Sequence, residues 1–363
     1  MFTILFYIII GLLIPWGLVK SEYEFPTYRF AGINWDIRLL LFFIITVLVR
    51  GLAYNTGQDY WHYSDYYENI VADIPDDWGE HTEWGFRIVV YILASFFSSP
   101  SAFFILSSII VMATMIRISQ RYENAEAWVM MFWWWFMHVL SYNLYRQYWA
   151  ISFVLLFYFF YKDKDYKKAI LFAILSVLFH TSSILPIAVV YVIDRFSYIR
   201  YSRWTPIILV VLTTCLSKLF MSQIAEACDL VSLYYTLATG QVYEGTDLLD
   251  TAYDASILLF PNMIVYIIWL WLGYNYCEEH HEFKGIFNIF ALSLILTPIT
   301  RQEILMRICL YFVSFSPIML GVMASSDLKR NRLFLCSIAY MFVYYCYTLS
   351  LLLDEFPLSF SKD

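Results

Sequence analysis

Long apolar runs separated by short polar segments dominate the chain. A helix needs about 20 apolar residues to cross a bilayer. By this criterion we predict spans at 2–19, 38–54, 100–118, 126–142, 146–161, 168–180, 182–195, 204–221, 256–275, 284–299, 304–322 and 332–352. The runs 168–180 and 182–195 are short, which predicts a broken or re-entrant pair of helices around His180. The pattern predicts an all-α polytopic membrane protein of about 12 transmembrane helices, with residues 1–363 forming one transmembrane domain.

The apolar stretch 84–98 needs a different interpretation. If it crossed the membrane, the lysine-rich segment 162–168 would lie outside, against the positive-inside rule. A helix lying along the membrane surface removes this conflict. We therefore predict an outer loop at 55–99 that carries a surface helix, and a second outer loop at 222–255.

Composition and charge support this class and predict the orientation of the chain in the membrane. The chain is 61% hydrophobic and 15% charged, whereas soluble proteins have roughly 45–50% apolar and 25% charged residues. The predicted inner segments hold 16 of the 23 basic residues, while segments 55–84 and 222–255 hold 14 acidic residues and no lysine or arginine. Both termini then face outward. Segment 2–19 lacks a basic flank and a cleavage site, which indicates a retained span.

Ionisable residues in or beside the spans are costly to bury, so each is a functional-site hypothesis. These residues are Asp59, His62, Asp65, Glu83, Arg87, Arg146, His180, Arg301, Glu303 and Arg307. All fall near the predicted outer ends of spans, which indicates one outward-facing site.

Segment 57–67 contains two carboxylates and a histidine among five aromatic rings. Aromatic faces with hydrogen-bonding groups between them suit sugar rings. The alternative is an interfacial aromatic belt with solvated acids. The candidate sugar-binding residues here and nearby are Tyr60, His62, Tyr63, Asp65, Glu83, Asn143 and Gln147.

Three arginines at the outer ends of spans match a ligand with two phosphate charges. A guanidinium grips phosphate oxygens as a fork, which makes Arg146, Arg301 and Arg307 candidate diphosphate ligands. Snorkelling of Arg146 and a helical Glu303–Arg307 ion pair are the simpler alternatives. His180 is either a satisfied structural histidine or a cavity residue at a helix break.

The chain carries no nucleotide-binding or zinc-binding motif, and its six cysteines show no metal-ligand spacing. We expect no cofactor and no metal. The two histidines at 280 and 281 fit a solvated inner loop. A transferase of this kind has to take its donor from the outer side of the membrane, for which a lipid diphosphate is the obvious candidate.

Five short motifs follow one another along the chain: Gly57-x-Asp59-Tyr60-x-x-Tyr63, Glu83-x-Gly85-Phe86, Asn143-x-x-Arg146-Gln147, His180-x-Ser182, and Arg307 followed by Tyr311. In this order they resemble the motifs of the EpsG/Wzy-type bacterial polysaccharide polymerases. The resemblance implies a fold like that of C-type glycosyltransferases. It also implies transfer of a growing glycan from undecaprenyl diphosphate to the non-reducing end of a lipid-linked repeat unit, at the outer face of the bacterial inner membrane. By the same analogy we expect a chain-length regulator protein as a partner. We expect no nucleic acid among the partners.

This chemistry needs positive charge for the leaving diphosphate and a base for the acceptor hydroxyl. We assign the charge to the three arginines and the base to Asp59, with His180 and Glu303 as further catalytic candidates. Three alternatives stay open: a ligase or other lipid-linked glycosyltransferase, a flippase or transporter, and a membrane acyltransferase. A transporter typically shows internal repeats and charges along a midplane path, and the sequence shows neither.

Overall fold

A computed structural model describes residues 8–9, 26–57, 59–74, 82–122, 124–219, 255–299 and 303–351. Most of the predicted span 2–19, nearly all of the predicted loop 222–255, and Arg301 lie outside these residues.

The described residues form helices and one small hairpin. The helices are α2 (Ile37–Leu52), α3 (Tyr60–Val71), α5 (Trp84–Phe96), α6 (Ser101–Ser119), α7 (Glu126–Trp133), α8 (Tyr145–Lys162), α9 (Tyr166–Phe179), α10 (Ile184–Arg195), α11 (Trp204–Leu219), α13 (Ala255–Glu279), α14 (Lys284–Leu296), α15 (Glu303–Val313), α16 (Ser316–Ser325) and α17 (Arg332–Leu351). The hairpin pairs β1 (Tyr28–Phe30) with β2 (Ile33–Trp35) in antiparallel register.

The helical class is confirmed, with local differences from the predicted spans. The segment 126–142 is a short α7, then a π-helical turn at Trp134–His138 and a 3-10 turn at Leu140–Tyr142. The segment 304–322 divides into α15 and α16. The break at His180 is confirmed, because α9 ends at Phe179 and a 3-10 turn at Thr181–Ser183 precedes α10.

The protein is a helical membrane protein. Within the described residues, three stretches are long and apolar enough to cross a bilayer: Ser101–Ser119, His281–Ile299 and Leu305–Ser325. Shorter apolar helices occupy Trp84–Phe96, Trp204–Ser217 and Arg332–Tyr347. The total of 12 transmembrane helices stays a prediction.

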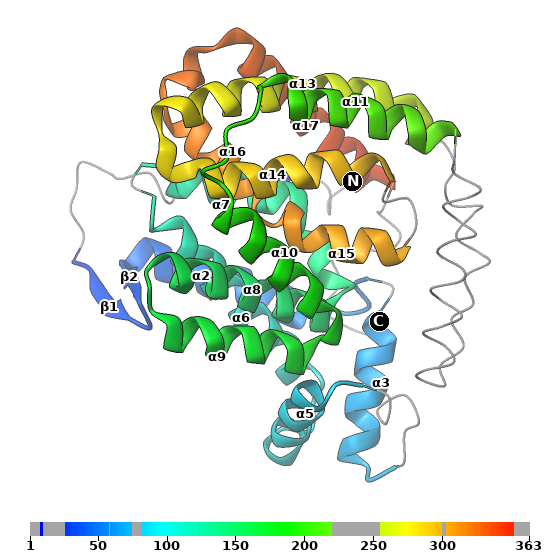
Figure 1. Cartoon of the computed structure of the whole chain (residues 1–363). Helices are drawn as coiled ribbons and strands as arrows, with labels where there is room; N and C mark the ends of the chain where they lie inside the picture. Colours follow the sequence, from blue (N-terminus) through cyan, green and yellow to red (C-terminus); the bar gives the residue numbers. More distant parts are fainter. Residues whose placement is uncertain are drawn as a thin grey trace.

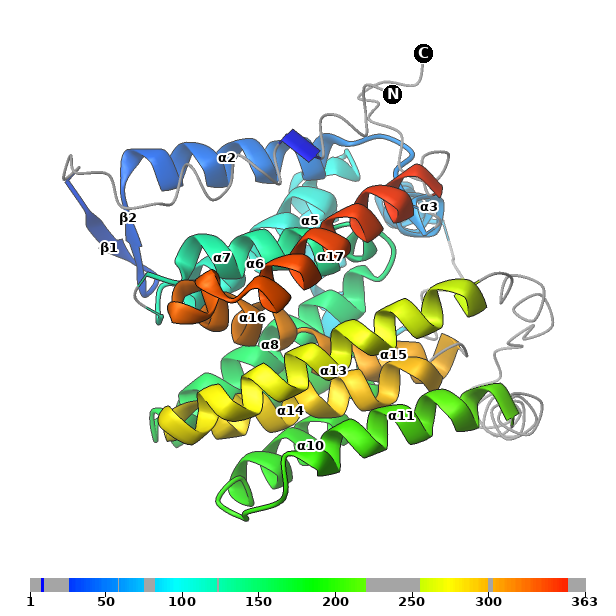
Figure 2. The same ribbon diagram turned by 90° about the horizontal axis from the view of Figure 1, so that it is seen from above.

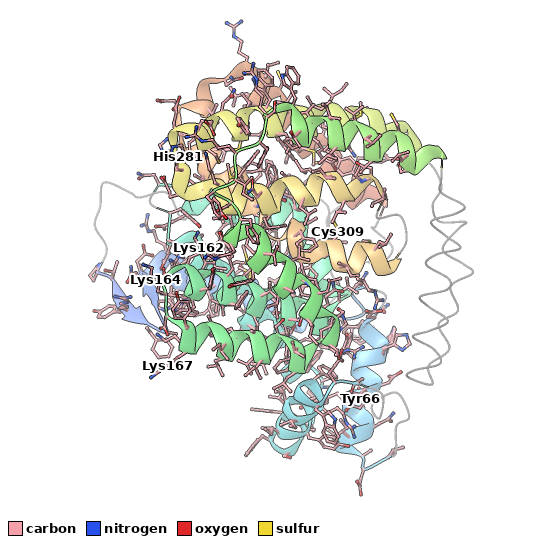
Figure 3. All side chains as sticks on the ribbon, viewed as in Figure 1. Tyr66, Lys162, Lys164, Lys167, His281 and Cys309 are labelled. Atoms are coloured by element: carbon pink, nitrogen blue, oxygen red, sulfur yellow. The ribbon has the colours of Figure 1, made fainter. Side chains whose placement is uncertain are left out.

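The long helices share one direction, and α3 lies across one end of them. In Figure 1, α9, α11, α13 and α14 run across the view while α3 is upright. In Figure 2, α11, α13 and α14 again run across the view and α3 is seen along its axis. Lys162, Lys164 and Lys167 lie at the end of the bundle away from α3 (Figure 3). We call these two ends the α3 end and the basic end.

Helix α8 passes through the core and connects the two ends. Trp149, Ala150 and Val154 are fully buried at its centre, and its 18 residues correspond to roughly 27 Å. Its first turn, at the α3 end, carries Arg146. Its last residue, Lys162, forms an ion pair of 3.1 Å with Asp194, which connects α8 to α10 at the basic end.

Candidate functional site

Glu83 is the centre of a charged cluster at the α3 end. Its Oε2 lies 2.5 Å from Nη1 of Arg146 on α8. Its Oε1 lies 2.9 Å from Nδ1 of His180 and accepts a hydrogen bond of 3.3 Å from the backbone N–H of Thr181. One carboxylate therefore joins the start of α5, the start of α8 and the break between α9 and α10.

The environment of Glu83 keeps its carboxyl ionised. Burial opposes ionisation, but the hydrogen bond with His180 and the charge of Arg146 outweigh it and lower the pKa of Glu83 to about 2. The Arg146 side chain is 21% exposed, so it remains reachable from outside the core.

The residues after Glu83 explain how its position is fixed. A Cβ on Gly85 would lie 2.7 Å from the carbonyl oxygen of Leu178, so only glycine lets α5 approach the end of α9 this closely. Phe86 is fully buried, and the guanidinium carbon of Arg146 lies 5.7 Å from its ring centroid. The Glu83-x-Gly85-Phe86 motif therefore positions the carboxylate against both Arg146 and His180.

His180 is held in one orientation by this carboxylate. It is the C-cap of α9, with extended backbone at φ −159° and ψ 105°. Because a carboxylate only accepts hydrogen bonds, Nδ1 of a neutral His180 carries the proton and Nε2 carries the lone pair. This assignment follows from the hydrogen-bond partner. His180 thereby has the arrangement of a general base oriented by an acid.

Helix α15 completes the cluster from a distant part of the chain. The Gln147 side-chain amide donates a hydrogen bond to the backbone carbonyl of Arg307. The Tyr311 hydroxyl faces Ser182, and its ring is fully buried. Two residues of the motifs, Arg307 and Tyr311, therefore bring α15 against α8 and the break at His180.

Helix α3 contributes through Tyr63. The Tyr63 hydroxyl hydrogen-bonds the Arg146 guanidinium, and Asp59 lies one turn before Tyr63 at the N-cap of α3. Gly57 precedes this helix with φ +88°, and a Cβ there would collide with Oδ1 of Asn143. Glycine at this position fixes the start of α3 beside the start of α8.

The structure brings most of the sequence candidates together but not all of them. The cluster contains the side chains of Tyr63, Glu83, Arg146, Gln147 and His180. Arg307 joins it through its backbone carbonyl, which accepts the hydrogen bond from Gln147. Tyr60 is buried with its ring stacked on Phe104 at 4.9 Å, whereas His62 and Asp65 are on the exposed side of α3. The side chain of Glu303, the first residue of α15, lies outside the described residues, as does Arg301. The individual roles remain predictions.

Two buried residues near the cluster were not among the sequence candidates. Arg50 of α2 is 1% exposed, and its Nη2 donates to the carbonyl of Ser141 at 2.5 Å. Its guanidinium carbon lies 5.3 Å from the Tyr142 ring centroid. His138 is 1% exposed and stacks on Trp134 with centroids 3.7 Å apart. Arg50 therefore holds the turn from which α8 starts. Its position within an apolar run was the signal in the sequence that could have identified it.

The described part of the chain contains no group of three histidine, cysteine, aspartate or glutamate residues arranged for a metal. The cluster contains an ionised carboxylate, an oriented histidine and a half-buried arginine. This set can accept a proton and stabilise a developing negative charge in the same place.

A helical membrane protein with such a cluster is a candidate for group transfer at a membrane surface. The comparison with known families makes this specific: the model of the EpsG family matches residues 36–360. The chain therefore belongs to the EpsG family, a glycosyltransferase-like family with a polysaccharide polymerase-type role. No curated protein sequence and no solved structure matches the chain.

Proposed function

We propose that this protein is a polysaccharide polymerase of the bacterial inner membrane. It transfers a growing glycan from undecaprenyl diphosphate to the non-reducing end of a new lipid-linked repeat unit. The observation that carries this proposal is the half-buried cluster in which Glu83 contacts both Arg146 and His180.

The cluster supplies the two groups that the reaction needs. Nε2 of His180 takes the proton of the acceptor hydroxyl, whose oxygen forms a bond to the anomeric carbon of the donor glycan. The bond between that carbon and the diphosphate oxygen breaks, and the diphosphate leaves with the electron pair. Arg146 and Arg307 stabilise its charge. We place the base at His180 ahead of Asp59, because Glu83 orients the histidine at 2.9 Å.

An apolar groove beside the cluster supports a lipid-linked donor. Helices α8, α9 and α10 line this open groove, which has a volume of about 630 Å³. The residues that line it include Ala173, Leu178, Ile184 and Ala188. Leu178 and Ile184 flank the break that contains His180, so a prenyl chain in this groove has its diphosphate at Arg146.

The sidedness of the proposed site rests on charge and length. The basic end fits the inner face of the membrane, which puts the cluster at the outer face. Helix α5 has 13 residues, which correspond to roughly 20 Å and fall short of a hydrocarbon core of about 30 Å. Its exposed Trp84, Ile88 and Phe96 suit a helix that lies in the membrane surface.

The direct test uses purified protein in liposomes with lipid-linked repeat units as the only substrate. We expect a ladder of products that differ by one repeat unit, with release of undecaprenyl diphosphate. EDTA leaves the ladder unchanged if arginine carries the diphosphate charge. Loss with EDTA and recovery with Mg²⁺ contradicts metal independence.

The alternative function is that of a ligase, which uses the same lipid donor and a different acceptor. A ligase releases undecaprenyl diphosphate only after its own acceptor is added and makes no ladder from repeat units alone. The same assay therefore separates the two functions.

A further inference from the structure

A polar pocket lies at the basic end, far from the Glu83 cluster. It has a volume of about 500 Å³, and its charged lining consists of Arg29, Arg117, Arg121, Lys168, Asp163 and Asp165. Asp163 follows the last residue of α8, whereas Arg146 is in its first turn. The pocket and the cluster therefore lie at opposite ends of the same helix.

The pocket is built by the hairpin folding over the end of α6. The hairpin turn has positive φ at Ala31 and Gly32, as a tight two-residue turn requires. The Ala31 carbonyl accepts a hydrogen bond of 2.9 Å from Nη1 of Arg117. The Gln120 side chain makes two hydrogen bonds of 2.9 Å with the backbone of Asn34. The wall formed by the hairpin is thus fixed to α6.

The charges in this pocket do not cancel. Asp163 is paired with Arg121 at 2.8 and 2.5 Å, and Asp165 is paired with Lys168 at 2.6 Å. Arg29 and Arg117 form no ion pair with a carboxylate among the described residues. The charges of Arg29 and Arg121 both act on Arg117, so positive charge is concentrated there.

The surroundings of Arg29 are consistent with a pocket at the depth of the lipid headgroups. Successive side chains of a strand point to opposite faces, and Arg29 lies between Tyr28 and Phe30, each 74% exposed. Exposed aromatic rings of this kind are typical of membrane interfaces. Basic pockets between helices on the inner side of a membrane suit phosphate headgroups.

We propose that this pocket binds a phosphate group, with Arg29 and Arg117 as its principal ligands. The ligand is the headgroup of an anionic phospholipid or a free phosphate compound, since both present the same chemistry. The site is independent of the proposed transfer reaction, because it lies at the other end of the bundle and shares no residue with the cluster.

The test measures ligand binding by the full-length protein in a neutral detergent, with phosphatidylglycerol and inorganic pyrophosphate as separate probes. Arg29→Gln should weaken binding about tenfold, the loss of one hydrogen-bonded charge. Lys167→Gln is the matched control, because it removes one positive charge at the same end outside the pocket lining. Arg29 is preferred over Arg117 for the variant because Arg117 also holds the hairpin.

The two probes distinguish the sources of the phosphate group. If Arg29→Gln binds only phosphatidylglycerol more weakly than the wild type does, the site is specific for a lipid headgroup. Weaker binding of pyrophosphate as well supports a general phosphate site. Equal losses in Arg29→Gln and Lys167→Gln, or no binding of either probe by the wild type, overturn the proposal.

Discussion

Replacing Glu83 by glutamine tests the electrostatics of the cluster most sharply. The substitution keeps the size of the side chain but removes the charge that pairs with Arg146 and orients His180. The pKa of the Glu83 carboxyl is lowered from 4.5 to about 2, which corresponds to about 3 kcal/mol of stabilisation at neutral pH. Breaking a buried ion pair by removing one partner costs a similar ~3–5 kcal/mol. The Glu83 side chain is 15% exposed, so solvent screening reduces this value little.

The dependence on pH gives the experiment its direction. The contribution of a carboxyl with a lowered pKa is present above its unfolded pKa, and it is lost as pH falls through the folded pKa. The difference in unfolding free energy between wild type and Glu83→Gln should therefore be largest above pH 4.5 and shrink as pH falls toward about 2. Denaturant unfolding in detergent micelles at several pH values measures it. Glu68→Gln, at an exposed carboxyl of α3, is the control. A difference that does not change with pH, or none at all, refutes the reasoning.

Three further predictions follow from the same geometry. Gly85→Ala should destabilise the protein by about 1–3 kcal/mol and lower activity, since its Cβ meets the Leu178 carbonyl at 2.7 Å; wild-type stability and turnover contradict this. His180→Ala should abolish turnover while donor binding persists; turnover at the wild-type rate excludes His180 as the base. Ala188→Phe should fill the groove and raise KM for the long-chain lipid donor about tenfold, but leave a short-chain donor unaffected; equal effects on both donors contradict the groove.

The sequence predicted features that depend on a few residues along the chain. The break at His180 was readable because two apolar runs were each too short to form a complete span. The meeting of Glu83, Arg146 and His180 could be predicted because ionisable residues in or beside membrane spans are costly without partners.

Features that depend on tertiary contacts could not be predicted. The segment 126–142 forms a π-helical turn and a 3-10 turn where its apolar pattern predicted a continuous span. The carbonyl of Ser141, in that 3-10 turn, is held by Arg50, which is 91 residues away in sequence. The hairpin at Tyr28–Trp35 was also missed, because its stability comes from side chains of α6.

The pairing of Arg146 with Glu83 changes the interpretation of both residues. From the sequence alone, Glu83 was predicted to be a sugar ligand and Arg146 a diphosphate ligand, and the two predictions were independent. The ion pair of 2.5 Å makes them one unit, in which Glu83 positions Arg146 and His180 together. Sequence spacing carries no information on this, because the two residues are 63 positions apart.

The central claim is that the Glu83–Arg146–His180 cluster is where repeat units are joined. The most direct measurement is the glycan length distribution in a bacterial strain that lacks its own polymerase and expresses Arg146→Gln. Arg38→Gln is the matched control, since it removes an arginine that pairs with a carboxylate, Asp36, at 3.0 Å at the start of α2. With equal protein levels, we predict single repeat units for Arg146→Gln and full ladders for Arg38→Gln. Full ladders from Arg146→Gln would contradict the account.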